Sequence, residues 1–174
     1  MTQRWNSGWT DERVDFIPIA YAIDGASAPD AKETLTSTNK VDIRTFAHDA
    51  DEDVFIIWEA PLDLTCKTIQ FRVITWVHNA TGPSAEGWAF FLRGASLGNG
   101  DILSATLGTA VKSSAASQTH VQYDRVATTW SGPVTITDLA AGESQVLKLY
   151  RDISDADDTY AQLIGVSGIE IRYS

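Results

Sequence analysis

The sequence predicts an all-β fold, a two-sheet antiparallel sandwich of the jelly-roll type with about eight to ten strands. Hydrophobic residues recur mostly at every second position, which is the period of a strand with one buried face. Gly, Pro, Asn, Asp and Ser gather between these alternating segments as turn signals. No segment longer than about twelve residues keeps a helical period, so at most one short helix is expected.

The alternating segments give the predicted strands in chain order. They are residues 17–23, 41–45, 54–58, 69–78, 87–93, 119–126, 133–137, 144–151 and 168–174. In the last strand, Ile169 and Ile171 alternate with Glu170 and Arg172, which indicates one buried and one solvated face. The short helix is expected at residues 101–107, where Asn and Asp precede it as caps.

Two of the predicted strands are apolar on both faces. Residues 54–58 read Val-Phe-Ile-Ile-Trp without alternation, which predicts a central strand covered above and below. In residues 69–78, the outer face carries Gln70 and Arg72 and then Ile74 and Trp76. We expect Ile74 and Trp76 to form an exposed apolar half-face that a loop, the N-terminal arm or another subunit covers.

The chain is predicted to hold one domain, because 174 residues are too few for two comfortable cores. Residues 1–15 mix aromatic and charged side chains without a period, so they are predicted to form an N-terminal arm before the sandwich at 16–174. The arm has two interpretations. It packs on its own domain, or it reaches a neighbouring subunit with Trp5 and Trp9 as anchors, since Trp is a frequent interface hot spot.

The chain is acidic, with 13 Lys and Arg against 23 Asp and Glu and a net charge of −10. Such a surface repels phosphates, so nucleic acid is not an expected partner, and it keeps crowded protein soluble. No stretch approaches the roughly 20 apolar residues of a membrane span, and the start lacks the apolar core of a signal peptide. We therefore expect synthesis in the cytoplasm, no export by the standard route and no membrane partner.

The densest group of carboxylates is Asp152, Asp155, Asp157 and Asp158, directly after a predicted strand. It lacks the spacing and the glycine of a calcium-binding helix-loop-helix. These residues are therefore predicted to be solvated turn carboxylates that cap backbone N–H groups. Asp155, Asp157 and Asp158 are a weaker candidate for a structural Ca²⁺, and no other metal or cofactor is expected.

Catalytic constellations are not expected, and the protein is predicted not to be an enzyme. His48, His78 and His120 stand singly, without zinc-ligand spacing, and are predicted to lie at the surface or at strand ends. Cys66 precedes an apolar run, which predicts a buried, inert thiol. No Gly-x-Ser-x-Gly nucleophile elbow occurs, and no specific pair of acids indicates glycoside hydrolysis.

The tryptophans raise the question of sugar stacking. Trp58, Trp76 and Trp88 lie in apolar strands, where core packing is expected. Trp130 precedes a Ser-Gly-Pro turn at a strand end and is the best candidate for an exposed ring. It has two interpretations, namely packing at the rim of the sandwich or glycan binding, as in carbohydrate-binding modules.

Several packing and turn motifs have a familiar arrangement. They are Asp157-Asp158-Thr159-Tyr160-Ala161 followed by residues 166–173, residues 57–61 (Ile-Trp-Glu-Ala-Pro), the strand pair 68–78 and 87–93, and residues 107–110 (Leu-Gly-Thr-Ala). They resemble a group of small β-sandwich proteins encoded among the virion structural genes of tailed bacteriophages and prophages. The resemblance covers residues 50–174, whereas the first 45 residues match no part of the group.

The resemblance implies a structural part of a virion, such as a capsid decoration or cement protein, a head fibre or a tail component. It brings no catalytic residues. We expect a decoration or cement subunit located in the virion, with the major capsid protein or other virion proteins as partners. Decoration proteins of tailed phages are often trimers, so a homotrimer is implied. The alternative is a carbohydrate-binding or receptor-recognition module of a phage tail, with Trp130 at the glycan.

Overall fold

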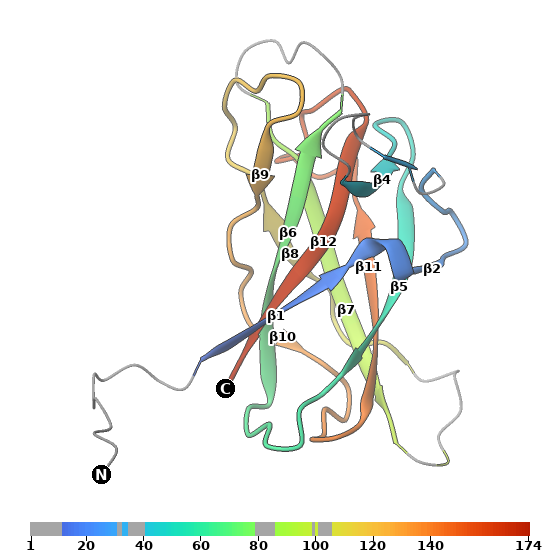
Figure 1. Cartoon of the computed structure of the whole chain (residues 1–174), viewed down its shortest axis with the longest axis vertical. Coiled ribbons are helices and arrows are strands. Elements are labelled where there is room, and N and C mark those ends of the chain that lie inside the picture. The colour runs from blue at the N-terminus through green and yellow to red at the C-terminus, as the bar shows by residue number, and fades with distance from the viewer. Residues whose placement is uncertain (1–11, 31–32, 35–40, 79–85, 99, 101–105) are drawn as a thin grey trace.

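Two antiparallel β-sheets pack face to face in a computed structural model that describes residues 12–30, 33–34, 41–78, 86–98, 100 and 106–174 (Figure 1). The predicted all-β, two-sheet sandwich is confirmed. The described residues contain twelve strands rather than eight to ten, because several pairings involve only two or three residues. The predicted helix at 101–107 falls mostly outside the described residues.

One sheet, sheet A, is built around its C-terminal strand. Its members are β1 (Arg13–Pro18), β3 (Glu33–Thr34), β4 (Asp42–Phe46), β6 (Thr68–Val77), β9 (Arg125–Ala127), β10 (Val134–Thr135) and β12 (Ile164–Tyr173). On one side β12 pairs with β6 along most of its length, and on the other it pairs with β4 and then with β1. The far edge of β6 carries β9 and β10.

The other sheet, sheet B, has the strand order β2-β5-β11-β7-β8. Its members are β2 (Ile23–Asp24), β5 (Glu52–Glu59), β7 (Ala89–Leu97), β8 (Val111–Ser114) and β11 (Ser144–Arg151). Here β11 is central and pairs over eight residues with both β5 and β7.

The connections are those of a jelly roll. The innermost pair is β7 with β8, and successively more distant strands pair around it: β6 with β9 and β10, β5 with β11, and β4 with β12. These nested pairs alternate between the sheets, as a long hairpin does when it is rolled into two layers. This topology brings residues near 70 and near 170 side by side.

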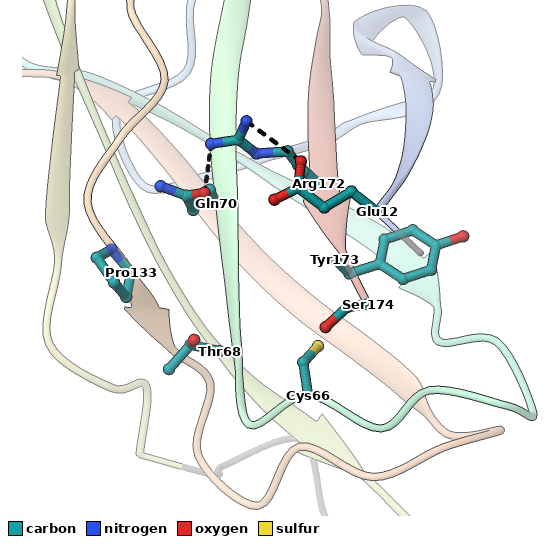
Figure 2. Close-up of a pocket in the computed structure, with 8 residues that line it drawn as sticks. All are labelled: Glu12, Cys66, Thr68, Gln70, Pro133, Arg172, Tyr173 and Ser174. Atoms are coloured by element: carbon teal, nitrogen blue, oxygen red, sulfur yellow. Dashed lines mark hydrogen bonds and ion pairs between the residues drawn. The ribbon is translucent and has the colours of Figure 1, made fainter. Parts of the chain in front are cut away.

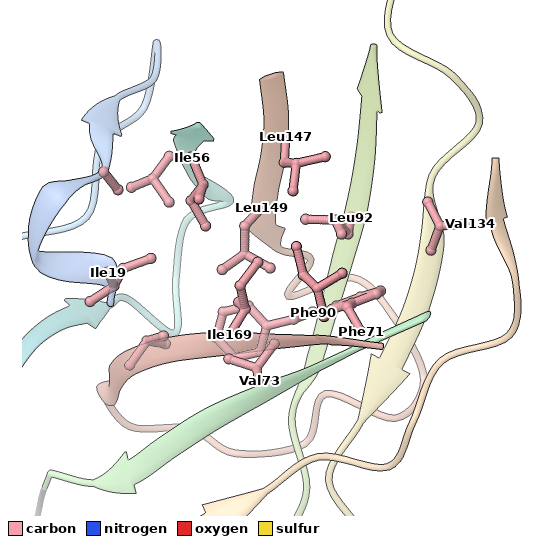
Figure 3. Close-up of a cluster of buried hydrophobic side chains, with 14 of the residues drawn as sticks. Ile19, Ile56, Phe71, Val73, Phe90, Leu92, Val134, Leu147, Leu149 and Ile169 are labelled. Atoms are coloured by element: carbon pink, nitrogen blue, oxygen red, sulfur yellow. The ribbon is translucent and has the colours of Figure 1, made fainter. Parts of the chain in front are cut away.

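The core lies between the sheets (Figure 3) and comes from the alternation in the sequence. In β11, Leu147 and Leu149 are buried while Lys148 and Tyr150 face outward, as the period predicts. Phe46 and Phe90 meet across the sandwich in a T-shaped contact, with ring centroids 5.2 Å apart. Each such side chain contributes about 1.5–3 kcal/mol when fully buried.

The predicted strand at 17–23 is wrong. β1 ends at Pro18, a 3₁₀ turn follows at Ile19–Tyr21, and the chain then enters sheet B as β2. Pro18 lacks the N–H that a longer strand would need, and the chain crosses between layers at this point. As a result Ile19 lies in the core while Tyr21 and Ile23 are exposed.

The covered, central strand predicted at 54–58 is also wrong. β5 lies next to the short edge strand β2, and its side chains alternate. Val54, Ile56 and Trp58 are buried, whereas Ile57 on the outer face is exposed. A sandwich has only two layers, so the outer face of each sheet meets solvent.

Two boundaries differ from the prediction. β1 begins at Arg13, so the last residues of the predicted arm at 1–15 belong to the sandwich. The predicted strand at 119–126 is mostly a turn, and only Arg125–Ala127 pairs with β6. Tyr123 takes a left-handed φ of 71° there, which a strand does not permit.

Candidate functional site

The richest group of polar and aromatic side chains lies on the outer face of the β6–β12 pair. Gln70 stands opposite Arg172, and Arg72 stands opposite Glu170. Because strand side chains alternate, these even-numbered residues face outward while their odd-numbered neighbours enter the core. With Trp130, which follows β9, these four residues form what we call the Trp130 ladder.

The ladder is held together by its own contacts. The Arg72 Nε donates to Glu170 Oε2 at 2.5 Å, and Arg172 bonds the side chain of Gln70. The guanidinium carbons of Arg72 and Arg172 lie 4.7 and 4.6 Å from the centroid of the Trp130 ring. Such cation–π contacts contribute about 0.5–2 kcal/mol each. Trp130 is half-buried, and both of its cationic neighbours come from its own chain.

A shallow hollow of about 280 Å³ lies at one end of the ladder (Figure 2). It is lined by Glu12, Cys66, Thr68, Gln70, Pro133, Arg172, Tyr173 and Ser174. Its carboxylate, guanidinium, amide and hydroxyl groups match a ligand rich in hydroxyls, although typical ligand pockets are larger, at about 300–1,000 Å³. Cys66 is half-buried at this hollow, so the buried position expected for its thiol is wrong.

The apolar half-face expected at Ile74 and Trp76 is not exposed as predicted. Ile74 is only 2% exposed. β9 pairs alongside it, and the ring of Phe16 lies against Gly168, the residue opposite Ile74. The half-buried Trp76 donates its Nε1–H to Ser167 Oγ at 3.1 Å. Ile74 is therefore buried and Trp76 half-buried within the chain's own fold.

The exposed apolar side chains of sheet A lie instead on β1, where the sequence pattern did not place them. Val14 and Phe16 are each 51% exposed and stand opposite Arg172 and Glu170, beside the Trp130 ladder. The alternation of Val14 and Phe16 with Asp15 and Ile17 does indicate a strand. The residues before it have no regular period, however, and so the pattern was assigned to the arm. Trp5 and Trp9, the predicted anchors, lie outside the described residues.

Asp15 fastens β1 to the sandwich. Its carboxylate accepts hydrogen bonds from Trp58 Nε1 at 3.0 Å and from the Tyr173 hydroxyl at 3.1 Å. Burial raises the pKa of Tyr173, and the hydrogen bond to Asp15 raises it further. The strand that presents Val14 and Phe16 is thus tied to both sheets.

The acidic cluster at 152–158 divides into two groups with different partners. Asp155 and Asp157 both bind the ammonium of Lys112, at 3.0 and 2.8 Å. Asp158 is almost fully buried and pairs with the guanidinium of Arg151 at 2.7 Å, so the interpretation of solvated turn carboxylates is wrong for Asp158. Within the described residues, no three His, Cys, Asp or Glu side chains are placed to hold a metal ion.

A second hollow on sheet B contains acids of the kind a hydrolase requires. Asp51, Glu52 and Asp53 line it together with Lys148 and Tyr150. Burial raises the pKa of Glu52. Glu52 accepts the Ala47 N–H at 2.6 Å, and Asp53 is paired with Lys148. These carboxylates hold the surrounding turns together.

The histidines and tryptophans fall partly where they were expected. Trp58 and Trp88 are buried as predicted, and His48 is exposed. The surface or strand-end position expected for His120 is wrong, because its side chain is buried against the Trp88 ring.

In the part of the chain that the structure describes, no helix has the length and apolar character needed to cross a membrane.

Comparison with known proteins adds no family to this description. No protein-family model and no curated protein matches the chain. Its class is given by its strand topology alone, which is that of a jelly-roll β-sandwich.

Proposed function

We propose that the chain is a structural subunit of a bacteriophage virion, most specifically a capsid decoration or cement subunit that docks on the capsid shell and stabilises it. The observation that carries the proposal is the exposed apolar pair Val14 and Phe16 on β1, directly after the segment that contains Trp5 and Trp9. The resemblance of residues 50–174 to virion β-sandwich proteins supports the same role.

The proposed mechanism is interfacial. Among the described strands β1 pairs only with β12, and Asp15 ties it to both sheets. Docking through this strand and the arm would bury apolar surface against the major capsid protein or another virion protein. Several subunits, proposed to be joined as a homotrimer, would bridge neighbouring capsomers by multivalent contact. The net charge of −10 would keep decorated particles dispersed.

The test adds the purified full chain to undecorated capsids and measures the bound stoichiometry by sedimentation and electron microscopy. We expect saturable binding at a fixed number of copies per capsid. The double variant Val14→Ser/Phe16→Ser should weaken binding at least tenfold, and so should Trp5→Ala/Trp9→Ala. The control is Leu62→Ser, which also removes an exposed apolar side chain but lies in the loop after β5.

Absence of binding by the wild-type chain would refute the decoration role. Equal binding by the wild type and both double variants would refute the docking surface while leaving the role itself intact. Sedimentation equilibrium of the free protein tests the trimer, which predicts three times the 19.0 kDa mass of the chain.

The second candidate is a carbohydrate-binding module of a phage tail, favoured by the polar hollow at the end of the Trp130 ladder (Figure 2). Glu12, Gln70 and Arg172 could donate to or accept from sugar hydroxyls there. A glycan array probed with the wild type and with Trp130→Ala separates the two functions. Specific binding that the substitution abolishes would support the glycan role, and no binding to any glycan would exclude it.

A further inference from the structure

Residues 116–123, which connect β8 to β9, are a surface segment with one inserted side chain. Their side chains are all exposed except that of His120, which is only 2% exposed. Backbone hydrogen bonds hold the segment at two points. Gln118 exchanges bonds of 3.2 and 3.3 Å with Glu86, and the Tyr123 N–H donates to Val77 O at 2.8 Å. Between these points, His120 is the side chain that enters the interior.

The environment of His120 suits its neutral form. Its ring packs against the fully buried Trp88, with centroids 4.8 Å apart, and Trp88 in turn contacts Tyr160. Neither imidazole nitrogen makes a hydrogen bond of ordinary geometry within the described residues. Burial lowers the pKa of His120 and outweighs the groups that favour its protonation, which are the charge of Asp124 and the backbone and charge of Glu86.

We propose that residues 116–123 form a strap over Trp88. Neutral His120 holds the strap closed by packing on Trp88, and protonation of His120 releases it. An imidazolium in this position would be a buried charge, and the backbone of Glu86 and the charges of Asp124 and Glu86 would offset its desolvation only in part. In the released strap the same cation would reach water and could pair with Asp124 or Glu86. Release would also relieve the left-handed conformation of Tyr123, whose φ is 71°.

The direction of the pH effect follows from the lowered pKa. A histidine that is harder to protonate in the latched state stabilises that state fully above the unfolded pKa of about 6.5. The stabilisation is lost as the pH falls from about 6.5 through the lower pKa of the latched form. The strap should therefore be closed at neutral pH and should open under mildly acidic conditions, uncovering Trp88.

Hydrogen exchange of the full chain, followed by mass spectrometry between pH 7.5 and 5.0, tests this device. Protection factors corrected for intrinsic exchange should fall at least tenfold in residues 116–123 while those of β6 and β12 change less than twofold. His120→Phe keeps an aromatic ring without a titratable group and should abolish the pH dependence. His48→Phe, at an exposed histidine, is the matched control and should behave like the wild type.

Three results would overturn the proposal. They are an unchanged strap at pH 5.0, an equal pH response in His120→Phe, and a simultaneous loss of protection throughout the sandwich. Should His120→Phe not fold, imidazole NMR of the wild-type chain decides the question. We expect a His120 midpoint below 6.5 that coincides with a shift of the Trp88 indole signal, and a midpoint at or above 6.5 would contradict the latch.

Discussion

The Arg151–Asp158 pair offers the most demanding test of how this sandwich is held together. Arg151 ends β11 with its side chain fully buried between the sheets. Its Nε and Nη2 donate to the two Asp158 oxygens at 2.8 and 2.7 Å. The other guanidinium bonds reach backbone carbonyls: Phe46 and Ala47 at the end of β4, and Tyr160 and Gln162 before β12. One side chain thus joins sheet B to two segments of sheet A.

Asp158→Asn should destabilise the fold strongly. The substitution keeps the shape of the side chain but removes the carboxylate that, among the described residues, is hydrogen-bonded to Arg151, so the buried guanidinium loses its ion-pair partner. Breaking a buried pair from one side costs about 3–5 kcal/mol. A domain of this size loses about 2–4 °C of Tm per kcal/mol, so a loss of about 3–5 kcal/mol corresponds to a fall of about 6–20 °C. Arg151→Met should cost at least as much, because it also leaves four carbonyl acceptors without a donor.

Urea unfolding followed by tryptophan fluorescence measures both variants and the double variant Arg151→Met/Asp158→Leu. The double variant should be more stable than the sum of the single losses predicts, with a coupling of about 2 kcal/mol, because neither charge is left alone. Asp63→Asn is the control, since it removes one partner of the exposed Arg13–Asp63 pair and should hardly move the midpoint. A loss below about 1 kcal/mol in Asp158→Asn would refute the argument that this pair is an internal tie.

Three further predictions concern β1 and the Trp130 ladder. Gly168→Ala should lower the free energy of unfolding by about 1–3 kcal/mol, because an added Cβ would lie 2.6 Å from the Phe16 ring. The amides of β1 should then exchange faster, and unchanged protection of β1 would contradict this. Asp15→Asn should lower the pKa of Tyr173 towards 10, since burial would remain but the carboxylate would not, and ultraviolet titration of the phenol measures it. Trp130→Ala should lower the free energy of unfolding, measured with urea, by about 1–3 kcal/mol because two cation–π contacts are lost. An unchanged free energy of unfolding would show that the guanidinium groups find equal partners elsewhere.

The sequence predicts the strand bounds best where hydrophobic residues at every second position all face the core. The strand at 144–151 has the predicted bounds, and that at 69–78 is displaced by one residue. The last strand was expected from Gly168, although β12 begins at Ile164. The reason is a bulge between Val166 and Gly168, which shifts the core-facing residues from even to odd numbers. A prediction that assumes a constant two-residue period ends the strand at such a bulge.

The candidate sites were harder to predict than the strands, because they depend on which outer-face residues become neighbours. Asp158 resembles its neighbours in the acidic run, and only the fold shows that it turns inward to Arg151. Trp130 was chosen from its place at a strand end, but its two arginine neighbours lie about 40 and 60 residues away. The burial of His120 was equally hard to predict, since nothing in its local sequence indicates that it packs against the Trp88 ring.

The two sides of β12 differ in a way that leads us to propose β1, rather than the ladder, as the docking surface. On the ladder side, the charges of Arg72 and Arg172 are already offset by Glu170 and Glu12 and shared with an aromatic ring. A partner that binds there must first displace these contacts, and desolvating paired charges is costly. On the β1 side, Val14 and Phe16 are uncharged and each 51% exposed, and burying them would release water from apolar surface. Binding through β1 should therefore depend little on salt, whereas binding through the ladder should weaken as salt screens its charges.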